Sequence, residues 1–372
     1  MGTRTMTDEL TQSATPRGHR YSTPRQQYAA KLTTPAKAVE RLESGSTLCL
    51  ALGVGMPGGL AKAVADRILA GDLKNLNLYF QHSMKYSAET LIRPAVLKNV
   101  NARCFFMGET DRKVVDVGLA EGRKYLSYVP INFSNIPRAL TEHIKVNTFV
   151  VTVSPMDKSG HFSLGTNNDY ASTVLRHCDH VIVEVNRNMP RVFGDSLVHV
   201  SEVHGIVEND APLVKIPYKD PDEDSLKIGK CIAEQIPDGA TLQLGIGNLP
   251  NAVAMQLTDR KDLGIHSELF SHAFVQLVRS GVANGRKKTI HPRKHVFTFA
   301  IGDDEVYQFI NDNPAMESYA SSYVNDIHVI AEHDNLISVN TAIEIELAGS
   351  EFFRDDGRVG HGSTGSRRQI NA

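Results

Sequence analysis

The chain has 372 residues, which is long enough for two domains with a substantial core. Its composition is ordinary for a globular protein, with 41% hydrophobic and 22% charged residues, and its formal net charge is −2. Basic residues do not gather in one block, which argues against nucleic acid or an anionic membrane as the main partner. No run approaches the roughly eighteen apolar residues of a membrane span.

The cysteines and the first residues bear on the compartment of the protein. The four cysteines lie far apart and form no CxxC pair, which is typical of a reduced compartment rather than of a disulfide or zinc framework. Residues 1–26 are polar and lack the apolar core of a secretory signal, so we expect them to be a disordered lead. The sequence therefore predicts a cytoplasmic protein.

Short runs of β-branched and apolar residues predict buried strands along the whole chain. They lie at 47–52, 76–80, 148–153, 180–185, 241–246, 262–270, 295–301 and 326–331. Helical patterns at 60–70 and 225–236 lie between them. Continuous apolar strands that alternate with helices predict an α/β fold with open, mainly parallel sheets covered on both faces.

The chain also repeats itself on the two sides of a polar segment, YKDPDEDS (218–225), which we take as a linker. SGSTLCLALGVGMPGGLAKAV (44–64) and DGATLQLGIGNLPNAVAMQL (238–257) each place a GxG loop between a strand and a helix. We therefore expect two similar α/β domains, at 27–217 and 226–349, followed by a divergent, disordered tail at 350–372.

One carboxylate stands out in the second half. Glu268 lies in LGIHSELFSHAF (263–274), where a charge without a partner is expensive to bury. When the two halves are aligned strand on strand, its counterpart in the first half is Gln81. The carboxylate is therefore not a requirement of the fold, and a chemical role is favoured over a salt bridge at a strand end.

The loop GIGNL (245–249) is the second feature of this half. It follows the strand that precedes the strand of Glu268. In a parallel sheet the C-terminal ends of neighbouring strands share one crevice, so the loop and Glu268 are expected to face the same ligand. Glycines at Gly245 and Gly247 let the backbone approach that ligand, and N–H groups at a helix start suit a phosphate or an oxyanion.

Other chemistries have weaker support. GVGMPG (53–58) fits GxGxxG, but the next strand ends in Gln81-His82 rather than in the acidic residue that a ribose requires, so a tight structural turn is the favoured reading. The histidines show no HExxH or other zinc spacing, so no metal is expected. Neither GxSxG nor a Cys-His nucleophile motif occurs, which leaves a carboxylate as the nucleophile candidate.

From about residue 28 to residue 349 the sequence resembles the acetyl-CoA hydrolase/CoA-transferase family, which includes butyrate, 4-hydroxybutyrate and succinate:acetate CoA-transferases. The motifs that carry the resemblance are VSPMDKSGHFSLG (153–165), VIVEVNRNMPRVFGDSLVHVSE (181–202), LQLGIGNLPNAV (242–253), DLGIHSELFS (262–271) and VNTAIEIELAG (339–349). The family has two similar open α/β domains, in agreement with the internal repeat.

The resemblance implies a ping-pong enzyme that uses one glutamate as a covalent carrier of coenzyme A. The glutamate of its LGIHxE motif is Glu268 here. Its GIGN-type loop contacts coenzyme A and supplies oxyanion-stabilising backbone, which carries over to Gly245, Ile246, Gly247, Asn248 and Leu249. The implied partners are an acyl-CoA and a small carboxylate, with coenzyme A as substrate, no permanently bound cofactor, and a homo-oligomer by analogy.

Two departures from the family pattern are visible. His272-Ala273 stand where the family has Asp-Gly, and after Gly349 the chain reads SEFFRDDGRVGHGSTGSRRQINA in place of a segment with a GGQ-type motif. Three alternatives to a transferase therefore stay open. They are a hydrolase that uses the same glutamate, a nucleotide-binding oxidoreductase that uses GVGMPG, and an inactive truncated homologue.

Overall fold

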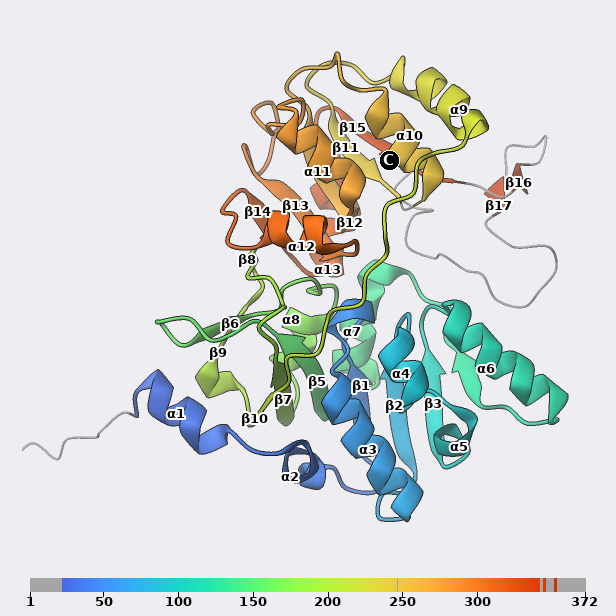
Figure 1. Cartoon of the computed structure of the whole chain (residues 1–372), viewed down its shortest axis with the longest axis vertical. Helices are drawn as coiled ribbons and strands as arrows, with labels where there is room; N and C mark the ends of the chain where they lie inside the picture. The colour runs from blue at the N-terminus through green and yellow to red at the C-terminus, as the bar shows by residue number, and fades with distance from the viewer. Residues whose placement is uncertain (1–21, 246, 342–343, 346–350, 353–372) are drawn as a thin grey trace, which may run out of the picture.

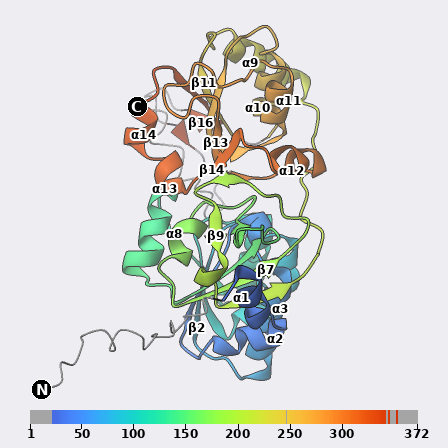
Figure 2. The same cartoon turned by 90° about the vertical axis from the view of Figure 1, so that its left-hand side faces the viewer.

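The computed structural model describes residues 22–245, 247–341, 344–345 and 351–352. Figure 1 shows two α/β halves stacked on each other, with the first half below and the second half above. The view turned by 90° keeps the same arrangement (Figure 2). The predicted class, two similar open α/β domains with mainly parallel sheets, is confirmed.

The first sheet has seven parallel strands in the order β10-β7-β5-β1-β2-β3-β4. Their bounds are β1 (Thr47–Leu50), β2 (Leu76–Phe80), β3 (Val100–Cys104), β4 (Leu126–Tyr128), β5 (Thr148–Val153), β7 (His180–Val185) and β10 (Gly205–Glu208). Alternate residues of β1 enter two different cores, with Leu48 and Leu50 in one and Cys49 in the other. The sheet is therefore covered on both faces, as its continuous apolar strands predict.

The helices of the first half lie on these two faces. They are α1 (Pro24–Lys31), α2 (Pro35–Ala38), α3 (Gly58–Ala70), α4 (Lys85–Glu89), α5 (Pro94–Leu97), α6 (Glu109–Ala120), α7 (Ile136–Arg138) and α8 (Ala171–Leu175). A small antiparallel pair, β6 (His161–Ser163) with β9 (Leu197–His199), completes this half.

The second sheet has six parallel strands in the order β15-β11-β12-β13-β14-β8. Their bounds are β8 (Phe193–Gly194), β11 (Thr241–Leu244), β12 (Gly264–Phe270), β13 (His295–Ala300), β14 (Met316–Ser318) and β15 (Leu336–Val339). Its edge strand β8 comes from the first half of the chain and pairs with β14. The halves thus share a sheet, which the sequence repeat does not predict.

The helices of the second half are α9 (Glu223–Ala233), α10 (Asn248–Met255), α11 (His272–Arg279), α12 (Asp304–Ile310), α13 (Ser321–Val324) and α14 (Ile327–Ala331). The last described strands, β16 (Glu344–Ile345) and β17 (Glu351–Phe352), pair with each other. Almost all of the predicted tail at 350–372 and most of the predicted lead at 1–26 lie outside the described residues. None of the described helices is long and apolar enough to cross a membrane.

One predicted strand, at residues 326–331, is wrong. Here the chain forms helix α14 (Ile327–Ala331), because Asp326 caps the helix by accepting hydrogen bonds from the backbone N–H groups of His328 and Val329. The apolar run has β-branched residues, but an aspartate at the N-cap position satisfies the first free amides of a helix. The other predicted strands correspond to β1, β2, β5, β7, β11, β12 and β13.

A buried polar segment joins the halves. Asn168 donates its backbone N–H to the Thr298 carbonyl at 3.0 Å and its side-chain amide to the Ser318 carbonyl at 2.9 Å. The next residue, Asp169, also donates its N–H to Thr298 and accepts the N–H of Ser321 at 2.6 Å. These bonds fix the strand ends β13 and β14 against the first half, and with them the walls of any site between the halves.

Candidate active site

Glu268 lies near the C-terminal end of β12, the strand between β11 and β13. Its side chain is half-buried, and Asn325 donates an amide N–H to its Oε2 at 2.5 Å. Burial raises the pKa of Glu268 to about 7, while the bond from Asn325 acts in the opposite direction. A carboxylate whose pKa lies near neutrality keeps a large anionic fraction and is poorly solvated, as a nucleophile requires.

Asn325 owes its place to helix α13, which ends at the preceding residue. Ser321, the first residue of α13, is bonded to the first half through its N–H to Asp169 and through its hydroxyl to the Phe133 carbonyl at 3.1 Å. Asn325 itself is buried, and its Oδ1 has no hydrogen-bond partner among the described residues. The contact between the halves therefore orients the residue that holds Glu268.

Glu268 opens into a cavity of about 350 Å³ between the two halves. The apolar part of its wall consists of Leu52, Phe106, Ile216, Leu269, Phe299 and Ile301. The polar part, apart from Glu268, consists of Gln81, His82, Gln243, Asn340 and Thr341. Most of the apolar wall comes from other strands and from the other half, whereas Leu263, Ile265 and Phe270 beside Glu268 in sequence belong to the core of the second sheet.

The strand registers bear out the alignment of the two halves. Thr47 of β1 faces Asn77 of β2, and Thr241 of β11 faces Gly264 of β12 in the same way. Four residues further along β2 and β12 come Gln81 and Glu268, respectively. The two residues therefore occupy equivalent strand ends, and both line this cavity between the halves.

The glycine loop lies at the end of β11, the strand next to Glu268. Gly245 lines the cavity, and Ile246 lies outside the described residues. Gly247 has φ +117°, which favours glycine, and a Cβ there would meet no atom within 4 Å, so its backbone is open to approach. Asn248 begins α10 with its side chain bonded to Asp222 at 3.2 Å, and Leu249 packs against the core.

The other GxG loop, in GVGMPG (53–58), leads into a helix whose N-terminus binds a carboxylate of the protein itself. Helix α3 begins at Gly58, the last residue of GVGMPG, and the N–H of Leu60 donates to Glu184 Oε2 at 2.9 Å. Glu184 is buried, accepts from Asn209 at 2.8 Å, and is also bonded by the N–H groups of Gly58 and Gly59. The place where a phosphate would bind is thus filled by the protein's own carboxylate, so the structure gives no support to dinucleotide binding at this loop.

The departure at His272-Ala273 leaves the strand of Glu268 regular. His272 is the first residue of α11, and its Nε2 lies 2.5 Å from Glu305 Oε2. The ring of Tyr218, from the segment between the halves, packs against its imidazole with centroids 4.5 Å apart and an interplanar angle of 33°. Ala273 is buried in the core. His272 and Ala273 are therefore the first two residues of helix α11 and do not form a loop.

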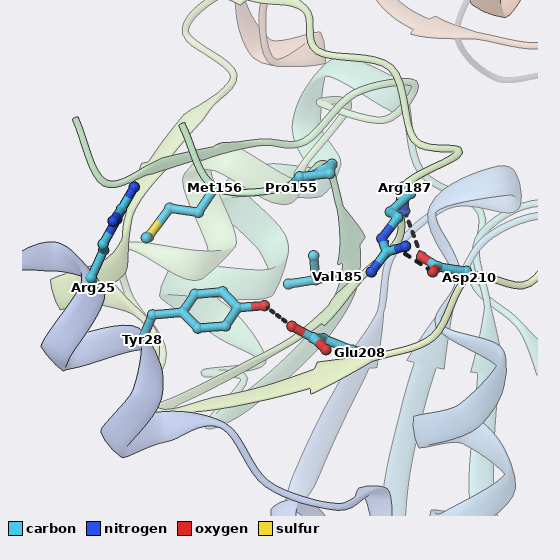
Figure 3. A pocket seen from close by; sticks show the side chains of 8 residues that line it. All are labelled: Arg25, Tyr28, Pro155, Met156, Val185, Arg187, Glu208 and Asp210. Atoms are coloured by element: carbon cyan, nitrogen blue, oxygen red, sulfur yellow. Dashed lines mark hydrogen bonds and ion pairs between the residues drawn. The ribbon is translucent and has the colours of Figure 1, made fainter. Parts of the chain in front are cut away.

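A second cavity of about 350 Å³ lies in the first half, beyond the ends of β7 and β10. Figure 3 shows that its carboxylates are bonded within the cavity itself, Glu208 to the Tyr28 hydroxyl at 2.6 Å and Asp210 to Arg187 at 3.4 Å. Gln81 and Glu268 do not line it. It is a separate hollow from the cavity of Glu268.

Comparison with known proteins decides the family. The N-terminal domain of acetyl-CoA hydrolase/transferase matches residues 15–217, and its C-terminal domain matches residues 302–366. The chain belongs to the acetyl-CoA hydrolase/transferase family. The resemblance seen in the sequence is therefore confirmed.

Several relatives within this family are CoA-transferases by name. The chain is 36% identical to the 4-hydroxybutyrate coenzyme A transferase of Clostridium kluyveri, over 87% of this chain and 73% of that protein. It is 35% identical to the butyryl-CoA:acetate CoA-transferase of Anaerostipes caccae, over 87% of this chain and 72% of that protein.

Solved structures of the family share its fold. RipA from Yersinia pestis is 43% identical, with a TM-score of 0.86 over 88% of this chain and 76% of that one. The 4-hydroxybutyrate CoA-transferase from Porphyromonas gingivalis is 29% identical, with a TM-score of 0.71 over 86% of this chain and 75% of that one.

Sequence reasoning expected Glu268 and the glycine loop to lie together, and the structure brings Glu268 and Gly245 to one cavity. It did not predict Asn325, which is bonded to Glu268, or His82, which lines the cavity. Asn325 was not predicted because residues 326–331, directly after it, have the pattern of a strand. The internal repeat did indicate which residue of the first half lies at the cavity. Gln81 aligns with Glu268 and therefore had to occupy an equivalent strand end.

Proposed function

We propose that the protein is a CoA-transferase that moves coenzyme A between an acyl-CoA and a small carboxylate, with Glu268 as the covalent carrier. The observation that carries the proposal is the cavity between the halves, where Glu268 is partly desolvated, held by Asn325 and adjacent to Gly245. Membership in a family whose relatives include CoA-transferases agrees with it.

The reaction begins when a carboxylate oxygen of Glu268 attacks the thioester carbonyl carbon of the acyl-CoA. The C–S bond breaks, the electron pair leaves with the CoA thiolate, and an acyl-glutamyl anhydride forms. The thiolate then attacks the carbonyl carbon of Glu268, which releases the acyl group as a carboxylate and leaves a glutamyl-CoA thioester. An incoming carboxylate reverses these steps, so the thioester is conserved and no other energy source is required.

Each step passes through a tetrahedral oxyanion, which needs fixed hydrogen-bond donors. The loop Gly245–Leu249 is the proposed source, because it lies at the strand end beside Glu268 and its backbone at Gly247 is open to approach. Loss of one such donor typically lowers the rate about a hundredfold or more. The same loop is the proposed contact for coenzyme A.

Steady-state kinetics with butyryl-CoA and acetate test this proposal. A covalent carrier predicts a ping-pong pattern, with parallel double-reciprocal lines at different acetate concentrations. Glu268→Gln keeps the shape of the side chain but removes the nucleophile, so we expect transfer to fall at least about a thousandfold while the fold is retained.

Two results would count against the proposal. Substantial transfer by Glu268→Gln would remove Glu268 from the mechanism. Equal rates of CoA release with and without acetate would identify a hydrolase, in which water resolves the same glutamyl intermediate.

A further inference from the structure

His266 and Glu268 share one face of strand β12, on which they lie two residues apart. The Nε2 atom of His266 lies 2.9 Å from the backbone carbonyl oxygen of Val324, the last residue of α13. The next residue, Asn325, donates its side-chain amide to Glu268 Oε2 at 2.5 Å. Two side chains from one strand therefore bind two consecutive residues at the end of α13.

The bond from His266 pairs a carbonyl group that a helix cannot pair by itself. The last carbonyl groups of a helix have no partner within it. Val324 is 1% exposed, so its carbonyl has little access to bulk water, and an unpaired carbonyl is costly at this depth. His266 therefore fixes the peptide group that joins Val324 to Asn325.

The acceptor and the burial together determine the state of the imidazole. A carbonyl oxygen cannot donate, so Nε2 of His266 carries a hydrogen. Burial lowers the pKa of His266 to about 3, and the nearby His333, Lys288 and His291 act in the same direction. The ring is therefore neutral, and its Nδ1 carries a lone pair that has no hydrogen-bond partner among the described residues. His266 is a neutral donor throughout the pH range in which Glu268 titrates.

Helix α13 is also attached at its other end. Its first residue, Ser321, donates its N–H to the Asp169 carbonyl at 2.6 Å and its hydroxyl to the Phe133 carbonyl at 3.1 Å. These bonds attach the helix to the first half, whereas the bond from His266 attaches its last residue to the strand of Glu268. A helix of four residues has little stability of its own, so its attachments set its position.

We propose that His266 is a positioning residue for the reaction, because its Nε2–H fixes the peptide group before Asn325 and so keeps the amide of Asn325 on Glu268. His266 is not among the described residues that line the cavity, so it acts through Asn325 and not on the substrate. The inference rests on the proposed role of Glu268 as the nucleophile and adds a residue that controls it.

The pH dependence of transfer reports the contact between Asn325 and Glu268. Burial raises the pKa of Glu268 to about 7, and the bond from Asn325 opposes the rise. A displaced Asn325 therefore leaves the carboxyl protonated up to higher pH. Among the described residues that line the cavity, the other titratable side chain is His82. Burial and the nearby Arg112 lower the pKa of His82, so it titrates at lower pH.

Two substitutions of His266 separate its hydrogen bond from its bulk. His266→Leu removes the donor, so kcat/KM for butyryl-CoA with acetate should fall about tenfold at pH 7, and the midpoint of the pH profile should rise. His266→Gln places an amide N–H at the end of a side chain of similar reach, so it should restore most of the activity and the wild-type midpoint. In an Asn325→Leu background, His266→Leu should add no further shift, because both substitutions act on one contact. The measurement is kcat/KM from pH 5 to pH 9.

His333 provides a matched control. It is a buried histidine whose ring packs against that of His266 with centroids 4.7 Å apart, but neither of its ring nitrogens has a hydrogen-bond partner among the described residues. His333→Leu makes the same change beside His266 without the loss of a hydrogen bond, so the midpoint should keep its wild-type value. His266→Asn gives a second test in a polar side chain, since its shorter amide does not reach Val324. Thermal unfolding of each variant shows which of them fold.

The outcomes separate positioning from a structural role. An unchanged midpoint in folded His266→Leu and His266→Asn, with a loss of rate no greater than that of His333→Leu, would assign His266 a structural role and overturn the inference. A shifted midpoint that His266→Gln does not restore would also overturn it, because the hydrogen bond would then not be the cause. The proposed function is tested separately, by the loss of transfer in Glu268→Gln. Transfer retained by Glu268→Gln would overturn the proposed function and, with it, the inference.

Discussion

At the scale of single residues, the environment of Glu268 decides its chemistry. Burial raises its pKa to about 7, and the bond from Asn325 opposes that shift. The same carboxyl in an unfolded chain has its ordinary, lower pKa. Ionisation of Glu268 therefore weakens the fold, so its favourable contribution is present below its ordinary pKa and is lost as the pH rises through about 7. This cost in stability is what the proposed role of Glu268 as a nucleophile would require.

The pH dependence of the reaction follows from this pKa. Because the ionised carboxylate is the attacking group in the proposed mechanism, kcat/KM for an acyl-CoA should rise with pH and level off above a midpoint near 7. Asn325→Leu removes the bond that lowers the pKa, so its midpoint should lie at higher pH. The measurement is kcat/KM for butyryl-CoA from pH 5 to pH 9. A flat profile across this range in the wild-type protein would contradict the assigned pKa.

At the scale of elements, the two halves use the same strand–loop–helix unit in opposite ways. In the first half the N-terminus of α3 binds Glu184 from β7, whereas in the second half the loop before α10 stays open beside Glu268. The strand ends differ in the same sense, since β2 leads to Gln81 and β12 carries Glu268. One half thus provides the proposed nucleophile and the loop beside it, and the other half provides a wall of the cavity.

Removal of the charge of Glu184 tests how much its hydrogen bonds at the start of α3 stabilise the first half. Glu184→Gln turns one acceptor atom into a donor that faces backbone N–H groups, so we expect the protein to lose about 1–3 kcal/mol of unfolding free energy. Glu208→Gln is the matched control on the neighbouring strand β10, where the exposed carboxylate accepts only the Tyr28 hydroxyl among the described residues. Urea denaturation measures both variants. Equal, small losses would show that the contacts of Glu184 do not stabilise the first half.

At the scale of the whole molecule, the sequence predicted the layers better than the site. Long apolar strands and the internal repeat were sufficient for two mainly parallel α/β halves, because burial on both faces leaves a strong pattern. Residues 326–331 failed because a single cap, Asp326, outweighs the β-branched residues after it. The sharing of β8 between the halves was also beyond reach, since a strand of two residues has no pattern of its own.

The same limit applies to the cavity. Glu268 and Gly245 could be placed together because their strands are neighbours in one sheet. Gln81 and His82 join them only through the packing of one half on the other, which hydrogen bonds such as Asp169 to Ser321 maintain. Asn325 joins them from the end of helix α13, which packs on β12 within the second half. Sequence spacing cannot report a contact between segments that are so far apart along the chain.

The most direct test of the account is to trap the intermediate on Glu268. The full chain is incubated with butyryl-CoA, treated with borohydride or hydroxylamine, digested, and examined by mass spectrometry, with Glu268→Gln as control. The account predicts a modified peptide that contains Glu268, formed only after exposure to the acyl-CoA and absent from the variant. An unmodified Glu268 in a protein that still transfers coenzyme A would contradict it.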